Sequence, residues 1–227
     1  MDNLLQTQKL TDCFICDAAK GNYWKVEDIP LFNRDGKLIF PATGSFSKDH
    51  CIVSPVEHVR SFANLSQVQL VGYLDLFNAM KKTTHKKYGD NLTIYETGMS
   101  DHEETGRNAI VHAHKQIFPN TDPEAAIHQV EKTLGNKLGK LDYVNDLHKL
   151  KNQRYLGILI DNQLHYHTGG FSRRFFRNEL CKMHGMPSYK ADYVEAPNLQ
   201  ATRETIKDFK AKALERELIK QERFLTR

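Results

Sequence analysis

Short apolar runs separated by turn-forming residues fill the first sixty positions of the chain. The runs YWKVEDIPLF and GKLIFPATG predict strands on either side of the turn signal NRDG, and HCIVSP adds a third, β-branched run. From Leu65 to Tyr88 the apolar residues recur at helical spacing. Because Ser66 stands near the start of this stretch and Gly89 just past its end, the pattern predicts a long helix.

Two further strands are predicted after the long helix, in NLTIYETG and NAIVHAHKQIF. The polar loop MSDHEETGR between them is expected on the side where a ligand binds. Up to residue 120 the order is therefore strands, one long helix, then strands. This order is typical of an α+β fold, and we expect an antiparallel sheet of five or six strands with flanking helices.

The second half of the chain has its own pattern. DPEAAIHQVEKTLGNKL predicts a helix capped by Asp122, RYLGILIDNQLHYHTGG a hairpin turning at DNQ, and SRRFFRNELCKMHG a short helix from about Ser172. The charged tail from about Asn198 predicts a long amphipathic helix. We expect one domain over 1–120 and, over 121–227, an α/β extension that packs on it and ends in the long helix.

Composition narrows the class of protein. Of the 227 residues 40% are hydrophobic, enough for a globular core, and no run approaches the about 18 apolar residues of a membrane span. The start MDNLLQTQKLTD lacks the features of a leader, so we expect a cytoplasmic protein with no membrane partner. A net charge of +4 and eleven histidines suit a phosphorylated small ligand at least as well as nucleic acid, which is not the expected partner.

The first candidate chemistry is the pair Cys13-x-x-Cys16, which fits a zinc site, a redox pair or chance. A redox pair of the thioredoxin type would open a helix, and DAAKGNYWKVEDIP offers at most one or two helical turns. Zinc is the better interpretation, but it needs two more ligands. His58, where a strand gives way to a loop, and His112 can supply them, although among eleven histidines the residues alone leave that choice open.

The second candidate is HAHKQ, in which His112, His114 and Gln116 alternate along an expected strand and so share one face. Ala113, Lys115 and Ile117 would point the other way. A neutral imidazole can ligate zinc or attack phosphorus, but not through the same nitrogen, so two histidines on one face suggest a division of labour. The alternative is a half-buried strand whose polar face meets solvent.

Together these segments resemble the histidine triad superfamily, in the branch of galactose-1-phosphate uridylyltransferase and diadenosine tetraphosphate phosphorylase. HAHKQ looks like its His-x-His-x-Gln motif, and CFIC, HCIVSPVEHV, the long helix and YETG follow in the family's order over about residues 10 to 120. The resemblance implies a HIT-like fold, a structural zinc and His114 as the nucleophile. The zinc ligands that it implies are Cys13, Cys16, His58 and His112.

The implied chemistry is attack of His114 on the α-phosphorus of a nucleotide, followed by resolution of a nucleotidyl-histidine by a second nucleophile. Gln116 would donate an amide hydrogen bond to a phosphate oxygen. The hydrolase branch usually has a third histidine here, and glutamine cannot give a proton to a leaving group, which favours transfer over hydrolysis. Many members have a serine or threonine that contacts phosphate just before the first histidine. Asn108 and Ala109 occupy that region here, and we expect Asn108 to contact the substrate.

The basic segment GGFSRRFFRNEL predicts a phosphate-binding element in the extension. A glycine pair before a helix start exposes backbone N–H groups, and Ser172, Arg173 and Arg177 would reach phosphate oxygens. The alternative is a basic, solvated helix face. The other His-x-His pair, His165 and His167, has no cysteine pair in step with it and predicts a strand edge. The tail helix is expected to pack on the domain or to form a homodimer.

The leading functional hypothesis is a zinc-containing nucleotidyltransferase or nucleotide phosphorylase that acts on a nucleoside polyphosphate or nucleotide-sugar. An alternative is a HIT-type hydrolase of dinucleoside polyphosphates or adenylylated molecules. A third hypothesis, from another class, is a nucleotide- or RNA-binding module without turnover. His114 argues against this third hypothesis, because members that lose catalysis commonly lose that residue.

Overall fold

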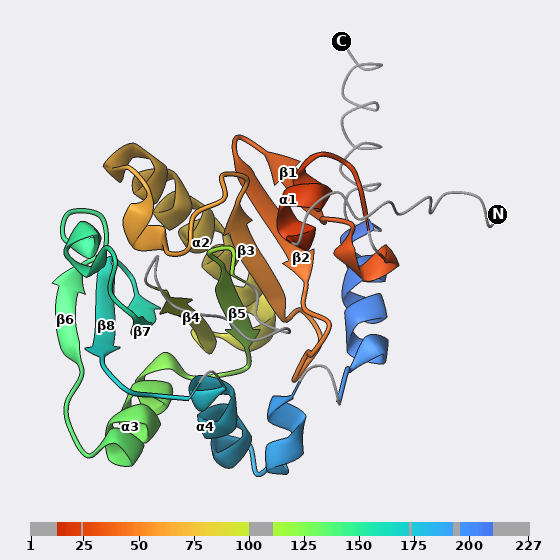
Figure 1. The fold of residues 1–227 in the computed structure, drawn as a ribbon. Helices are drawn as coiled ribbons and strands as arrows, with labels where there is room; N and C mark the ends of the chain where they lie inside the picture. Colours follow the sequence, from red (N-terminus) through yellow and green to blue (C-terminus); the bar gives the residue numbers. More distant parts are fainter. Residues whose placement is uncertain (1–12, 24, 100–110, 173, 193–195, 211–227) are drawn as a thin grey trace.

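The computed structural model describes residues 13–23, 25–99, 111–172, 174–192 and 196–210 (Figure 1). Over these residues the chain forms one antiparallel sheet flanked by helices, so the predicted α+β class is confirmed. The strands are β1 (Phe32–Arg34), β2 (Lys37–Pro41), β3 (Cys51–Pro55), β4 (Leu92–Gly98), β5 (Lys115–Pro119), β6 (Gly139–Asp142), β7 (Tyr155–Ile160) and β8 (Gln163–Thr168). The helices are α1 (Phe14–Ala19), α2 (Gln67–Tyr88), α3 (Pro123–Leu134), α4 (Phe175–Met183) and a helix over 199–210.

The eight strands lie in the order β1-β2-β3-β5-β4-β7-β8-β6, and every neighbouring pair is antiparallel. The first 120 residues supply five strands, as expected, and the rest of the chain supplies three. β7 pairs with β4 over five residues, from Ile94↔Leu159 to Gly98↔Tyr155. The two parts of the chain therefore share a single sheet.

Helix α2 covers one face of the sheet and is bounded by local signals that the sequence already shows. The Ser66 side chain accepts a hydrogen bond from the Gln69 backbone, the Gln69 side chain accepts one from the Ser66 backbone, and Gly89 follows the last turn with φ 61°. Tyr73 and Phe77 of this helix are buried in the core between α2 and the sheet. The prediction of this helix is confirmed.

The opposite face carries α1 at one place and α3 with α4 at another (Figure 1). Cross-strand partners point to the same face, and the register runs from Phe40 through Ile52, Gln116 and Tyr95 to Ile158. Phe40 packs against α1, and Tyr95 stacks on a phenylalanine of α4 at a centroid distance of 3.9 Å. Gln116 thus lies on this face of the sheet, between α1 and the pair formed by α3 and α4.

Several element boundaries differ from the prediction. Residues 26–28 form a 3-10 turn and not a strand, because Pro30 has no N–H and the ladder starts after it, at Leu31. β6 was not predicted, since GKLD contains a single apolar residue. α4 begins at Phe175, three residues later than expected. The long helix expected from Asn198 is described only over 199–210. Within the described residues, no helix has the length and apolarity needed to cross a membrane.

Candidate metal centre and active-site strand

The two cysteines of the C-x-x-C motif stand at the start of α1. Cys13 is the N-cap residue, and its carbonyl accepts a hydrogen bond from the Asp17 N–H, while Cys16 lies in the first helical turn. Residues three apart on a helix share a side, so both thiols are presented together. Ile15 and Ala18 are fully buried against β2, which fixes the helix on the sheet.

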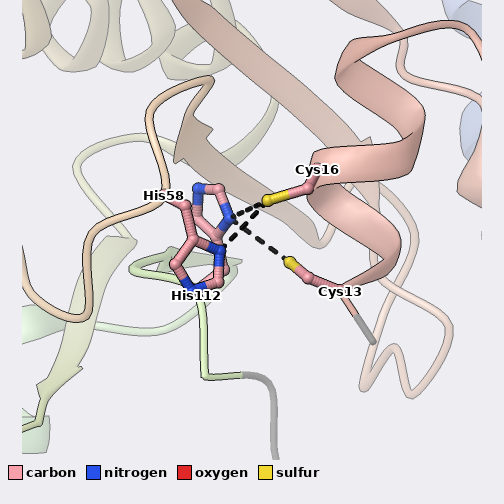
Figure 2. A group of neighbouring side chains, drawn as sticks. All are labelled: Cys13, Cys16, His58 and His112. Carbon is pink, nitrogen blue, oxygen red and sulfur yellow. Dashed lines mark hydrogen bonds between the residues drawn. The ribbon is translucent and has the colours of Figure 1, made fainter. Parts of the chain in front are cut away.

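Two histidines from distant segments meet these thiols (Figure 2). The Nδ1 atom of His58 lies 3.0 Å from the Cys16 Sγ, and the Nδ1 atom of His112 lies 3.4 Å from the Cys13 Sγ and 3.5 Å from the Cys16 Sγ. The four potential ligand atoms all lie within 4.8 Å of one another. The structure therefore brings together the four residues that the sequence analysis selected as metal ligands.

The orientation of His112 is set by a contact on the far side of its ring. Its Nε2 atom lies 2.8 Å from the carbonyl oxygen of Pro55, which can only accept, so Nε2 carries the proton and Nδ1 presents a lone pair to the thiols. Burial lowers the pKa of His112 to about 4. His112 is therefore a neutral imidazole with its lone pair directed into the cluster, as a metal ligand requires.

The donor set fits zinc. Ligand bonds of about 2.3 Å to sulfur and about 2.0 to 2.1 Å to nitrogen place S and N atoms about 3.5 Å apart in a tetrahedron, close to the separations observed. Burial, with the neighbouring Cys13 thiol, raises the pKa of Cys16 to about 12, so the Cys16 thiol would need a nearby cation to ionise at neutral pH. Two thiolates and two imidazoles would complete a four-coordinate, structural site.

The segment that bears His112 and His114 is not part of the strand, contrary to the prediction from HAHKQ. β5 begins at Lys115. The ladder with β3 stops there because β3 ends at Pro55, which has no N–H to donate. The preceding backbone is instead held by other groups: the Ala113 N–H donates to the Val59 carbonyl at 2.7 Å, and the Ser54 hydroxyl donates to the Ala113 carbonyl at 2.7 Å.

His114 is a partly exposed residue directly before β5. Its Nδ1 atom lies 2.9 Å from the backbone carbonyl oxygen of His112. Since the carbonyl only accepts, Nδ1 carries the proton and the Nε2 lone pair remains available. Burial lowers the pKa of His114, which favours the neutral ring.

Of the four predicted substrate-binding residues, the structure describes Ser172 and Arg177. Arg177 on α4 reaches β5, and its Nη1 atom donates to Gln116 Oε1 at 3.4 Å. Ser172 is exposed, and no hydrogen bond within the described residues joins it to Gln116. Asn108 and Arg173 lie outside the described residues.

A buried ion pair at the start of β5 was missed by sequence reasoning. Lys115 is fully buried, and its Nζ lies 2.5 Å from Glu96 Oε2 and 4.6 Å from the centroid of the Phe62 ring. The other carboxylate oxygen of Glu96 accepts from the Phe62 N–H at 2.8 Å. The alternation of side chains along the strand had predicted that Lys115 points away from Gln116. Nothing in the neighbouring sequence indicated that its partner is Glu96.

His50 was also missed. It is fully buried, with its ring 4.3 Å from that of Phe118 on β5, and its ring interacts with the side chain of Gln116. Burial and, after it, the charge of Arg177 lower its pKa well below the usual value. His50 is therefore a neutral side chain in the wall beside Gln116.

The second His-x-His pair lies elsewhere on the sheet. His165 is on β8, three strands from β5, and is 6% exposed. It lines an open hollow of about 420 Å³ together with residues of β6 and α3, including Lys140 and Glu124. His165 and His167 thus take no part in the cysteine and histidine cluster.

Fold and site together define an α+β protein with a Cys2His2 cluster that anchors a His-x-His-x-Gln segment. No family model matches the chain, and no curated protein matches it. Among solved structures, it is similar to the SMU.412c protein of Streptococcus mutans UA159, with 24% identity, a TM-score of 0.39, and coverage of 49% of this chain and 68% of that chain.

Two other solved structures have histidine triad names. A hypothetical histidine triad nucleotide-binding protein from Sulfolobus tokodaii strain 7 is 15% identical with a TM-score of 0.37, over 48% of this chain and 69% of that chain. A Hit-like protein involved in cell-cycle regulation from Bartonella henselae is 16% identical with a TM-score of 0.36, over 46% and 77%. Likeness at this level is partial, so the function of this chain has to be inferred from its own residues.

Proposed function

We propose that this protein is a histidine triad enzyme of the His-x-His-x-Gln type that transfers nucleotidyl groups through a nucleotidyl-histidine. Its substrate would be a nucleoside polyphosphate or a nucleotide-sugar, attacked at the α-phosphorus. The observation that carries the proposal is the contact between Nδ1 of His114 and the carbonyl oxygen of His112, 2.9 Å apart. A proton held on Nδ1 by the His112 carbonyl leaves Nε2 as a nucleophile, which a solvated surface histidine would not have fixed.

In the first step the Nε2 lone pair of His114 forms a bond to the α-phosphorus. The bond between phosphorus and the leaving oxygen breaks, and its electron pair departs with the leaving phosphate. The positive charge that develops on the imidazole is stabilised through Nδ1–H by the carbonyl of His112. In the second step an acceptor oxygen attacks the same phosphorus and returns the electron pair to Nε2.

Gln116 supports the assignment to transfer. Its amide can donate to a phosphate oxygen as charge shifts there, but it cannot protonate a departing group. Leaving groups that are stable anions, such as polyphosphates and sugar phosphates, need no such proton. We therefore propose phosphate or a sugar phosphate as the acceptor, with water as the alternative that the assay below distinguishes.

Zinc bound by Cys13, Cys16, His58 and His112 would hold the His112 segment in place. With four protein ligands it would leave no position for water, so its contribution would be structural. His112 lies two residues before His114, and its carbonyl orients that ring. The cluster thereby supports the nucleophile through the backbone.

We further propose that residues 121–227 form an extension to this catalytic domain. β7 extends the sheet from β4, and α3 and α4 cover the face that bears Gln116. The extension supplies Arg177 to that face.

The test is covalent labelling with nucleotides that carry ³²P at the α-phosphorus. Wild-type protein incubated with ATP or UTP should take up label that is lost in acid and stable in base, and His114→Ala should take up none. His167→Ala, a histidine of the other His-x-His pair, is the matched control and should label normally. The labelled protein is then incubated with phosphate, with a sugar phosphate, or with neither, so that only water can react. The product released identifies the acceptor. If wild-type protein binds nucleotide but never takes up label, the proposed mechanism is wrong.

A further inference from the structure

Arg177 is fixed at the active-site face by contacts with several parts of the chain. It is 7% exposed, and its guanidinium lies 4.4 Å from the centroid of the Phe46 ring. Nε donates to the Ala191 carbonyl at 2.8 Å, Nη2 donates to the Gly44 carbonyl at 2.6 Å, and Nη1 donates to Gln116 Oε1 at 3.4 Å. These acceptors belong to three separate segments, so the planar fork has little freedom to rotate.

The anchor at Gly44 is itself held by the C-terminal part of the chain. The buried Thr202 hydroxyl donates to the Ala42 carbonyl at 2.8 Å, and the Asn198 N–H donates to the Thr43 carbonyl at 3.0 Å. The loop between β2 and β3 is therefore fixed from the helix over 199–210. A rigid loop gives Arg177 a rigid position.

The contact between Arg177 and Gln116 determines which way round the Gln116 amide lies. A guanidinium has donors only, so the amide atom that faces it must be the oxygen. Rotating the amide by half a turn would set its N–H groups against those of Arg177. The amide nitrogen, with its two hydrogens, is consequently turned away from Arg177.

We propose that Arg177 is a positioning residue that selects the amide orientation in which Gln116 donates to the phosphate of the substrate. This assignment rests on the proposed function. It also gives Arg177 a different role from direct phosphate binding, because Nε and Nη2 are committed to backbone carbonyls. The extension would thus act on the chemistry by orienting a residue of the catalytic strand.

The kinetic test compares Arg177→Lys and Arg177→Met with Arg174→Gln as the matched control. Lysine at position 177 keeps the charge but cannot span the three acceptors. Arg174 suits the control because its side chain is 45% exposed and pairs with Asp192. Both Arg177 variants should form the covalent intermediate roughly 10- to 100-fold more slowly with KM nearly unchanged, as expected from a misplaced group. Arg174→Gln should match wild type, and an unchanged rate in Arg177→Lys would overturn the proposal.

A double-mutant cycle separates positioning from general support of the fold. In a Gln116→Leu background there is no amide to orient, so adding Arg177→Lys should cause no further loss of rate. If the rate losses of the two single variants multiply in the double variant, Arg177 does not act through Gln116 and the positioning role is contradicted. Circular dichroism and zinc content confirm that each variant is folded, and Arg177→Lys remains informative where Arg177→Met does not fold.

A second readout does not depend on activity. The side-chain amide resonances of Gln116, identified by their absence in Gln116→Leu, should shift in Arg177→Lys and stay in place in Arg174→Gln. Amide resonances that do not respond to Arg177→Lys would refute the contact. If wild-type protein takes up no label but the resonances shift, the proposed function has failed while the orientation of Gln116 by Arg177 stands.

Discussion

The Nδ1 atom of His114 lies 2.9 Å from the backbone carbonyl oxygen of His112. One histidine thus orients the ring of the next through its main chain, while its own ring faces two cysteine thiols. The position of the proposed nucleophile depends on the segment that the cluster holds. Stability of the cluster and availability of the Nε2 lone pair are therefore linked.

Loss of the proposed zinc should destabilise the protein. A structural zinc contributes directly to folding, so Cys16→Ser or a strong chelator is expected to lower Tm by on the order of 10 °C. Elemental analysis should find about one zinc per wild-type chain and none in Cys16→Ser. The control is Cys181→Ala, which alters a buried cysteine outside the cluster and should keep its zinc. Wild-type protein purified without any bound metal, yet with an unchanged Tm on adding zinc, would contradict the assignment.

The ion pair of Lys115 and Glu96 is expected to be sensitive to the loss of either partner. Lys115→Met leaves a carboxylate buried without its cation and should lower the free energy of unfolding by about 3 to 5 kcal/mol. The pair of Lys137 and Glu131 provides the contrast because the Lys137 side chain is 85% exposed, so Lys137→Met should cost less than about 1 kcal/mol. Urea denaturation monitored by circular dichroism measures both. Equal costs for the two variants would show that Lys115 is not paired in the core.

Asp28 should make stability depend on pH. Burial raises its pKa from 3.8 to about 6, so between these values the folded state holds a proton that the unfolded state has released. Stability from this group is therefore lost as pH rises from about 4 to 6, by on the order of 2 kcal/mol. Asp28→Asn should remove this loss and be more stable than wild type at pH 7. Asp35→Asn, in an exposed turn, is the control, and Tm values from pH 4 to 8 provide the measurement.

Gly98 at the end of β4 is expected to tolerate no side chain. A Cβ there would lie 2.0 Å from the buried Tyr155 ring, so Gly98→Ala must displace that ring. The free energy of unfolding should fall by about 1 to 3 kcal/mol. Tyr155 also shares a hydrogen bond of 3.0 Å with Ser61. Gly170→Ala, where a Cβ meets nothing within 4 Å, should leave Tm nearly unchanged. A stable Gly98→Ala protein would mean that Tyr155 is not held where the structure places it.

The features that the sequence predicts well are those with local causes. Helix α2 has its capping box and terminal glycine within its own segment, and the cap of α3 by Asp122 is equally local. The four clustered metal ligands were selected by motif and resemblance, not by periodicity. Pattern alone also placed Lys115 and Gln116 on opposite faces, as observed.

The features that escaped prediction depend on distant partners. The start of β5 is set by Pro55 on another strand, so the alternation in HAHKQ overstated the length of the strand. The partner of Lys115 is on β4, and the contact of Arg177 with Gln116 joins residues 61 positions apart. Neither pair has a local signature. Periodicity reports which face a side chain takes and not what it meets there.

The pairing of β7 with β4 has a consequence for how the chain can be divided. A protein cut after residue 120 would leave the outer side of β4 with a row of unpaired N–H and C=O groups, on the alternate residues that now bond to β7. Such an edge is a template for another copy of the same strand. The later strands therefore protect the molecule from self-association, and shortened versions should precipitate before they can be assayed.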